Sequence, residues 1–269
     1  MKKTLLILLT VVFLAVFGFG GYQLYLYYSE SAQSDETYLG LTDYVQVPDP
    51  TKNPPRPTDE TKEDGEEPDS DIDWPEVDFQ ALREINPDIV GWLYCEGTVI
   101  NYPVVQGNDN SYYLRHLFDG AYNANGCLFL DCRVNGDLSD AHSIIYGHHM
   151  KNGSMFSSLD GYKKQEYYEE HPQLLLVTLD TNYVVELFAG YVASVEEDAW
   201  AVGFTNEMEF ENWIVSAIEK STFESSVTPL PSDRIITLST CSYEFNDARF
   251  VVLGILKEYD TLGVTVMRN

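Results

Sequence analysis

The amino-acid sequence predicts a mainly β domain, a barrel or a sandwich, that starts near Trp74. Seven short runs rich in β-branched and aromatic residues follow one another from there, and turn residues separate them. Patterns typical of long helices are few between the runs, which favours a barrel or sandwich over alternating strands and helices. The seven predicted strands are residues 89–94, 127–130, 143–146, 174–179, 183–193, 234–240 and 249–257.

Two segments of this domain have the apolar spacing of helices. Residues 206–221 form an amphipathic pattern, and Asn206 followed by Glu209 resembles a capping box. Residues 78–85 predict a shorter helix that ends before Pro87, because proline does not continue a helix. The apolar positions of the longer pattern are Phe210, Trp213, Ile214, Ala217 and Ile218.

The N-terminus has the features of a membrane anchor. An uncharged stretch at residues 4–29 follows Lys2 and Lys3 and ends in a tyrosine-rich flank. About 20 apolar residues span a bilayer and tyrosine belongs at the headgroup level, so residues 1–29 predict a transmembrane signal anchor. The two lysines before the stretch and the acids after it predict a cytoplasmic N-terminus and an extracytoplasmic bulk. A cleaved signal peptide is the alternative, but no convincing small-x-small cleavage site precedes the tyrosines and the apolar segment is long for a signal peptide.

Residues 30–73 are expected to form an extracytoplasmic stalk. The segment is rich in proline, and nine acids against one lysine lie between Asp59 and Asp73. Such a composition buries too little apolar surface to offset the entropy of ordering, and its charges extend the chain. We therefore expect the stalk to hold the folded domain, residues 74–269, away from the membrane.

The charge of the chain excludes one class of partner. With 43 acids against 16 bases, the net charge is −27. Binding to nucleic acid depends on Lys and Arg releasing counterions from phosphate, so no nucleic acid is expected as a partner. Anionic lipid headgroups should repel the soluble part of the chain for the same reason.

Four cysteines, at positions 95, 127, 132 and 241, do not resemble the disulfide framework of a small secreted domain. Cys127 and Cys132 lie five residues apart in a strand-like run, so their side chains point to opposite faces and should not pair. No C-x-x-C occurs, and neither a zinc site nor a redox centre is expected. A core position is the default for three of the four thiols.

Two strand ends carry residues suited to nucleophilic catalysis. Cys241 ends the apolar run 237–241 (Thr-Leu-Ser-Thr-Cys), and Arg249 begins the next predicted strand. A cysteine at the rim of a sheet is partly exposed, and a neighbouring cation stabilises its thiolate. Another buried-looking strand ends at Gly147 and is followed by His148 and His149, where a histidine can act as acid or base. Each signal alone is ambiguous, because a single cysteine or histidine is more often structural.

Together these residues resemble the sortase family, whose pattern is Gly-His, then Thr-Leu-x-Thr-Cys, then an arginine that opens the following strand. The segment 146–156 (Tyr-Gly-His-His-Met-Lys-Asn-Gly-Ser-Met-Phe) and the helix at 206–221 are similar to features of class B. The resemblance covers about residues 74–258. It implies a closed sortase-type β-barrel with an N-terminal helical extension and one inserted amphipathic helix before the cysteine strand.

The resemblance also implies a role for each motif residue. Cys241 would be the nucleophile, His148 the acid and base, and Arg249 the group that holds the substrate carbonyl or the oxyanion. His149 does not match the catalytic position and is expected to be structural. The candidate substrate-binding residues are Ser239, Thr240 and Tyr146, with strand packing as the alternative for Ser239 and Thr240.

The implied activity is that of a membrane-anchored cysteine transpeptidase on the cell-wall side of the plasma membrane. It would cleave a C-terminal sorting signal of secreted proteins after Thr and transfer the protein to an amine of a peptidoglycan precursor or to a pilin lysine. No cofactor, metal or calcium dependence is expected. Two alternatives remain open: an extracytoplasmic cysteine endopeptidase that hydrolyses peptides, and a non-catalytic surface scaffold on a membrane tether.

Overall fold

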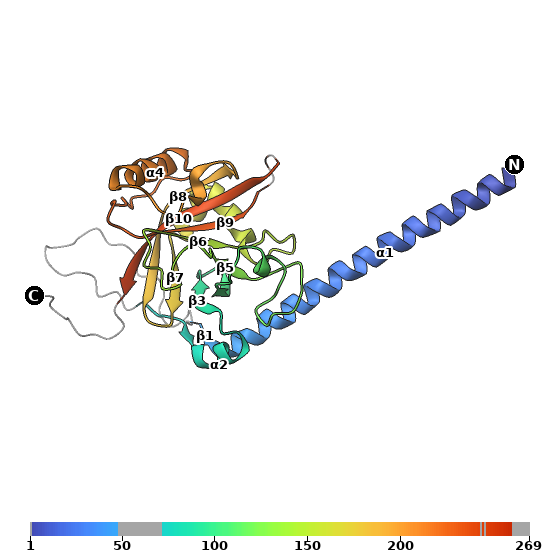
Figure 1. Cartoon of the computed structure of the whole chain (residues 1–269), viewed down its shortest axis with the longest axis horizontal. Helices are drawn as coiled ribbons and strands as arrows, with labels where there is room; N and C mark the ends of the chain where they lie inside the picture. Colours follow the sequence, from blue (N-terminus) through green and yellow to red (C-terminus); the bar gives the residue numbers. More distant parts are fainter. Residues whose placement is uncertain (1, 48–71, 243, 245, 260–269) are drawn as a thin grey trace, which may run out of the picture.

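A closed eight-stranded β-barrel carries a long N-terminal helix that projects from it (Figure 1). The computed structural model describes residues 2–47, 72–242, 244 and 246–259. Around the barrel the strand order is β10-β8-β7-β3-β4-β5-β6-β9. The strands are β3 (Ile89–Tyr94), β4 (Asn101–Val105), β5 (Leu128–Leu130), β6 (His142–Tyr146), β7 (Gln173–Thr178), β8 (Asn182–Ser194), β9 (Ile235–Cys241) and β10 (Ala248–Tyr259).

The barrel confirms the mainly β prediction and the seven predicted strands. It adds β4, which the sequence did not reveal because Pro103 lies inside it, and proline is usually confined to edge strands or strand starts. Pro103 lies opposite Trp92 of β3. The parallel pairing of β4 with β5 involves only Val104 and Val105, so no pairing with β5 requires an N–H at position 103, and the proline is tolerated there. A second parallel ladder joins β6 to β9.

Strands β8 and β10 are buried on both faces. Along β10, Phe250 and Val252 belong to the main core, whereas Val251 and Leu253 face a second apolar cluster. This alternation is the period of two expected of a strand. The second cluster exists because helix α4 (Glu207–Lys220) covers the outer face of these strands.

Helix α4 confirms the predicted amphipathic helix. Its buried residues are four of the five predicted apolar positions, and Ile218 is exposed. The side chain of Asn206 accepts a hydrogen bond from the backbone N–H of Glu209 at 3.0 Å, as an N-cap does.

The remaining elements are short. Helix α2 (Phe79–Ile85) matches the predicted helix at 78–85, and Asp78 caps it. The others are the two-stranded sheet of β1 (Val45–Gln46) and β2 (Glu76–Val77), helix α3 (Gln165–Glu170), and the 3₁₀ helices η1 (Thr42–Tyr44), η2 (Tyr112–Leu114), η3 (Phe156–Lys163) and η4 (Asp198–Trp200).

Helix α1 (Lys2–Leu41) extends beyond the predicted anchor and into the expected stalk. It is the one helix of the described residues that is long and apolar enough to cross a membrane. Its C-terminal part lies against the barrel, because Ser34, Tyr38 and Leu41 fall on one helical face and are buried. Residues 30–47 are thus part of the folded body, which differs from the expected stalk; residues 48–71 of that segment lie outside the described residues.

Candidate active site

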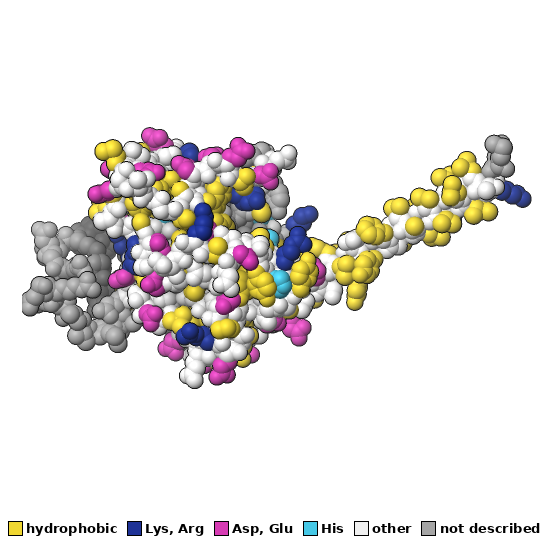
Figure 2. Space-filling view, viewed as in Figure 1, with side chains coloured by type: hydrophobic (Ala, Val, Ile, Leu, Met, Phe, Trp, Pro, Cys, Tyr) yellow, Lys and Arg dark blue, Asp and Glu magenta, His cyan; other side chains and the backbone are white. Residues whose placement is uncertain are grey.

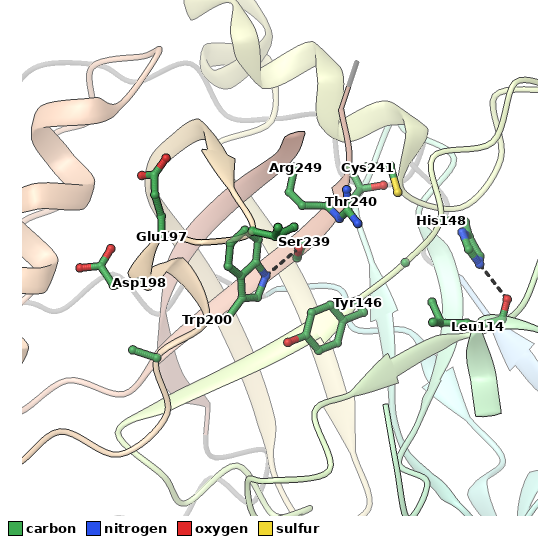
Figure 3. Close-up of a pocket in the computed structure, with 13 residues that line it drawn as sticks. Leu114, Tyr146, His148, Glu197, Asp198, Trp200, Ser239, Thr240, Cys241 and Arg249 are labelled. Carbon is green, nitrogen blue, oxygen red and sulfur yellow. Dashed lines mark hydrogen bonds between the residues drawn. The ribbon is translucent and has the colours of Figure 1, made fainter. Parts of the chain in front are cut away.

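One pocket of about 480 Å³ opens where β6, β9 and β10 meet, at the C-terminal ends of β6 and β9 (Figure 3). All six predicted site residues border it: Tyr146, His148, Ser239, Thr240, Cys241 and Arg249. Figure 3 shows the sulfur of Cys241 between the Arg249 and His148 side chains.

Cys241 and Arg249 are brought together by strand register. They are directly opposite each other in the antiparallel β9–β10 ladder. Side chains at such positions point to the same face of the sheet with Cβ atoms about 5 Å apart. Cys241 is a free, half-buried thiol, so it is open to a substrate in the pocket. The guanidinium of Arg249 uses one N–H to donate to the Ala248 carbonyl at 3.0 Å, and its other donors have no hydrogen-bond partner in the part of the chain that the structure describes.

His148 reaches the same pocket through the parallel β6–β9 ladder. This ladder pairs Tyr146 with Ser239, and the N–H of Gly147 donates to the Ser239 carbonyl at 3.0 Å. The following residue, His148, therefore lies beside the end of β9. A side chain at position 147 has no room, because its Cβ would lie 2.4 Å from Leu128.

A backbone carbonyl fixes the state of the His148 ring. The Nε2 atom of His148 lies 2.8 Å from the Leu114 carbonyl oxygen, which can only accept a hydrogen bond. Nε2 consequently carries a hydrogen, and Nδ1 is the nitrogen that is free to gain or lose a proton. His149 is held differently: its Nε2 pairs with Asp160 Oδ2 at 2.9 Å, away from the pocket lining.

Ser239 and Thr240 have different surroundings. Ser239 Oγ accepts a hydrogen bond from the Trp200 indole at 3.1 Å, which ties β9 to the pocket rim. Ser239 shares its strand face with Cys241, whereas Thr240 points to the opposite face and is 2% exposed. Its hydroxyl has no hydrogen-bond partner among the described residues.

Tyr146 forms one wall of the pocket over a buried charge pair. Its hydroxyl donates to Asp131 Oδ2 at 2.8 Å, and Arg133 donates to both carboxylate oxygens of Asp131 at 2.9 and 2.6 Å. Burial alone would raise the pKa of Asp131, but the hydrogen bonds from Arg133 and Tyr146 bring it well below its ordinary value. Burial, and then the Asp131 charge, raise the pKa of Tyr146, so its phenol stays protonated. Tyr146 is a fixed wall and not an acid or base near neutral pH.

The opposite rim comes from the segment between β8 and α4, which the sequence reasoning missed. Glu197, Asp198, Trp200 and Ala201 border the pocket. Glu197 pairs with Lys220 of α4 at 2.9 Å, and Trp213 of α4 donates to the Asp198 carbonyl at 3.0 Å. The one available signal in the sequence was an isolated tryptophan among acids, which does not specify a pocket.

Within the described residues, no group of three or more His, Cys, Asp or Glu side chains is arranged to hold a metal ion. The side chains that border the pocket offer a thiol, an imidazole and a guanidinium. This set suits acyl transfer through a thioester, in which a sulfur attacks a carbonyl and a positioned donor stabilises the oxyanion.

Two curated relatives are similar in sequence to this chain. Sortase B of Listeria monocytogenes is 36% identical over 181 residues, which cover 66% of this chain and 74% of the relative. Sortase B of Staphylococcus aureus is 34% identical over 178 residues, or 65% of this chain and 73% of the relative. No family model matches the chain.

Solved structures agree with these relatives. The crystal structure of Staphylococcus aureus sortase B superposes with a TM-score of 0.65 at 32% identity, covering 68% of this chain and 87% of that one. A Bacillus anthracis protein similar to sortase B gives a TM-score of 0.63 at 35% identity, covering 68% of this chain and 83% of that one. The shared sequence and the shared closed barrel show that this chain belongs to the class B sortases, a family of cysteine transpeptidases.

Proposed function

We propose that this chain cleaves a C-terminal sorting signal of secreted proteins after Thr and transfers the protein to an amine through a thioester on Cys241. The observation that carries the proposal is the register that pairs Cys241 with Arg249 and brings His148 to the same pocket. Three side chains from two ladders thus face one cavity.

In the first half-reaction, the thiolate of Cys241 attacks the carbonyl carbon of the signal's Thr and forms a C–S bond. The carbonyl electrons move to the oxygen, and the tetrahedral oxyanion then re-forms the carbonyl as the C–N bond breaks. His148 donates a proton from Nδ1 to the departing amine, while Leu114 holds Nε2–H. The products are a thioester on Cys241 and a free C-terminal fragment.

In the second half-reaction, the acceptor amine attacks the thioester carbonyl. His148, now neutral at Nδ1, removes a proton from the attacking nitrogen, and the C–S bond breaks to return the thiolate. Arg249 donates hydrogen bonds to the oxyanion in both steps, and a donor of this kind contributes about 3 kcal/mol to lowering the barrier.

The acceptor is an amine of the cell wall or a pilin lysine. A Staphylococcus aureus sortase B has been solved with its substrate, and sortase B has been solved in complex with triglycine. These relatives support a peptide sorting signal as donor and favour a glycine-type amine as acceptor. On our proposal Ser239 and Tyr146 contact the sorting signal through their side chains and Thr240 through its backbone, since all three border the same pocket.

Helix α1 is proposed to span the plasma membrane once. The helix is apolar across its first half, and Lys3 at its start supports an orientation with the N-terminus inside and the barrel on the cell-wall side.

The test is a donor peptide incubated with the full-length chain in detergent micelles, with and without an amine acceptor, and read by mass spectrometry. Cys241→Ala should abolish turnover, and His148→Ala and Arg249→Ala should each lower kcat/KM by about a hundredfold or more. His149→Ala is the matched control and should keep most of the activity. Unfolding midpoints should stay near that of the wild type in all four variants.

Two results would contradict the proposal. Product release that is equally fast without the amine, and no amide product with it, would indicate an endopeptidase. Failure of a thiol reagent or a sorting-signal mimic to label Cys241 in the folded chain would indicate a non-catalytic scaffold.

A further inference from the structure

The docking of α1 fixes how far the barrel lies from the membrane that the helix is proposed to span. A hydrocarbon core of about 30 Å takes about 20 helical residues at 1.5 Å each, so it would end near Leu24 if it begins at Leu5. The headgroup layer adds about 5–8 Å, or about three to five residues, and so extends at most to residue 29 and holds the tyrosine flank Tyr25, Tyr27 and Tyr28. Glu30 is then the first residue beyond the headgroups.

The barrel loops contact α1 just beyond the proposed headgroup layer, at residues 30–33. Asn123 donates from Nδ2 to the Glu30 carbonyl at 2.8 Å and to Gln33 Oε1 at 3.3 Å. From another loop, Asn152 donates to Ser31 Oγ at 3.3 Å. Because α1 is helical without interruption from Lys2 to Leu41, no flexible joint separates these contacts from the apolar segment. The loops that carry the two asparagines must therefore lie close to the headgroup layer.

The surface beside Asn123 has an unusual composition. It consists of Tyr112, Arg115, His116 and Tyr122, which we name the aromatic–basic surface. The His116 ring stacks on Tyr112 at 3.9 Å and meets Tyr122 edge-on at 5.6 Å. Arg115 donates to the Tyr122 hydroxyl at 3.3 Å. These ring contacts hold the side chains in place. The rings nevertheless remain accessible, since Tyr122 is 60% exposed and Tyr112 is 43% exposed.

Arg115 lies within electrostatic range of Glu30 on α1. Its pKa is raised, first by the hydrogen bond with Tyr122 and more weakly by the carboxylate of Glu30. Figure 2 shows Lys, Arg and His side chains together with hydrophobic ones on the barrel where α1 leaves it. Tyrosine rings with a polar tip and long basic side chains are the residues that favour the boundary between lipid and water.

We propose that the aromatic–basic surface rests in the outer headgroup layer of the membrane that α1 spans. This inference depends on the proposed anchor. Arg115 binds lipid phosphate, and the rings of Tyr112 and Tyr122 lie among the headgroups. The net charge of the chain does not oppose this contact, since charges farther away than about 8–10 Å are screened at physiological salt.

The proposal gives the active site a defined position. Leu114, whose carbonyl holds His148, is adjacent to Arg115 and borders the pocket. The pocket therefore opens at the membrane surface, and donor and acceptor reach Cys241 there and not at the end of a tether.

The test places one tryptophan at a time in the full-length chain, in vesicles of phosphatidylcholine and phosphatidylglycerol. The phosphatidylcholine is brominated near the top of its acyl chains, so that it quenches nearby indoles. Tyr122→Trp should lose most of its added emission in brominated vesicles. Val215→Trp, a matched position 47% exposed on α4, should keep its emission. Phe13→Trp, within the apolar segment of α1, should be quenched and so reports the anchor separately.

The outcomes separate the inference from the anchor. Equal emission of the Tyr122 and Val215 variants, with quenching of the Phe13 variant, would overturn the surface contact and leave the anchor intact. An unquenched Phe13 variant would overturn both. A Tyr122 variant whose emission depends on the number of chains per vesicle would assign the surface to a second copy instead. Added to Tyr122→Trp, Arg115→Gln should reduce the quenching more than Arg83→Gln, and equal effects would remove Arg115 from the contact.

Discussion

His142 provides a measurable link between the pocket rim and the strand that carries Cys241. It begins β6 and is 2% exposed. Its Nδ1 lies 2.6 Å from the Ala201 carbonyl and its Nε2 lies 2.8 Å from Thr237 Oγ1. Since the carbonyl only accepts, Nδ1 carries the hydrogen and Nε2 accepts from the Thr237 hydroxyl. The neutral ring thus satisfies both partners, and a second proton would turn Nε2 from acceptor to donor, so that the Thr237 hydroxyl would have to rotate and accept.

Burial lowers the pKa of His142 from 6.5 to about 4, and the hydrogen bond to Ala201 and the charge of Asp131 oppose this only in part. The unfolded chain therefore binds a proton below pH 6.5 that the folded chain refuses until about pH 4. The associated stability is present above pH 6.5 and is lost as the pH falls towards 4. At 1.36 kcal/mol for each pKa unit, the full loss is about 3 kcal/mol, of which about 2 kcal/mol falls between pH 7 and pH 5.

The measurement is urea unfolding of the full-length chain in micelles at several pH values, followed by tryptophan fluorescence. His142→Gln should lower the free energy of unfolding at pH 7 and remove most of the loss between pH 7 and pH 5. His171→Gln, a change at a partly exposed histidine, should keep the pH dependence of the wild type. If wild type and His142→Gln lose stability in parallel, the buried neutral imidazole is not the cause.

Two further pairs of substitutions test the walls of the pocket. Trp200→Phe removes the hydrogen bond to Ser239, worth about 1 kcal/mol, so KM for the donor peptide should rise about fivefold with kcat nearly unchanged. Ser239→Ala removes the same hydrogen bond and should have a similar effect. A double variant with a KM no higher than that of either single variant would show that the two residues act as a pair. Arg133→Gln leaves the buried Asp131 carboxylate without its cation and should lower the free energy of unfolding by about 3 kcal/mol in chemical denaturation. Asp131→Asn leaves Arg133 without its partner, but that side chain is 48% exposed and water solvates its charge, so the substitution should cost less; the reverse order would contradict this interpretation of the pair.

The sequence predicted where the strands and helices of the barrel lie better than it predicted which strands pair. Period and turn residues located seven of the eight barrel strands and two of the three described domain α-helices, because those signals are local; α3 was not predicted. Strand β4 was missed since Pro103 argues against a strand unless its pairing is known. The parallel β6–β9 ladder joins segments about 90 residues apart, and no local pattern specifies that contact. The prediction that His148 and Cys241 share a site came from the family resemblance.

Residues 30–47, the first part of the expected stalk, belong to the folded body for a reason that the composition does not reveal. Between residues 30 and 41 the charged and small side chains conceal a helical face made by Ser34, Tyr38 and Leu41, all buried in the structure. The burial of this face depends on partners far along the chain, such as the Gly126 carbonyl that accepts from the Tyr38 hydroxyl at 2.6 Å. Composition alone predicts that such a segment is solvated. Its burial depends on the surface of the barrel against which it packs, which the composition of the segment does not reveal.

The three proposed catalytic residues are held in place by different parts of the structure. Cys241 and Arg249 stand on paired strands of the barrel, whose positions are fixed by a ladder of backbone hydrogen bonds. His148 follows a strand, but its tautomer and orientation depend on the Leu114 carbonyl, and Leu114 belongs to the 106–127 connection that grips α1 through Asn123 and Gly126. A displacement of α1 is therefore transmitted to the imidazole before it reaches the sulfur. In this chain the N-terminal helix is a structural support of His148, the proposed acid–base group, in addition to being the proposed membrane anchor.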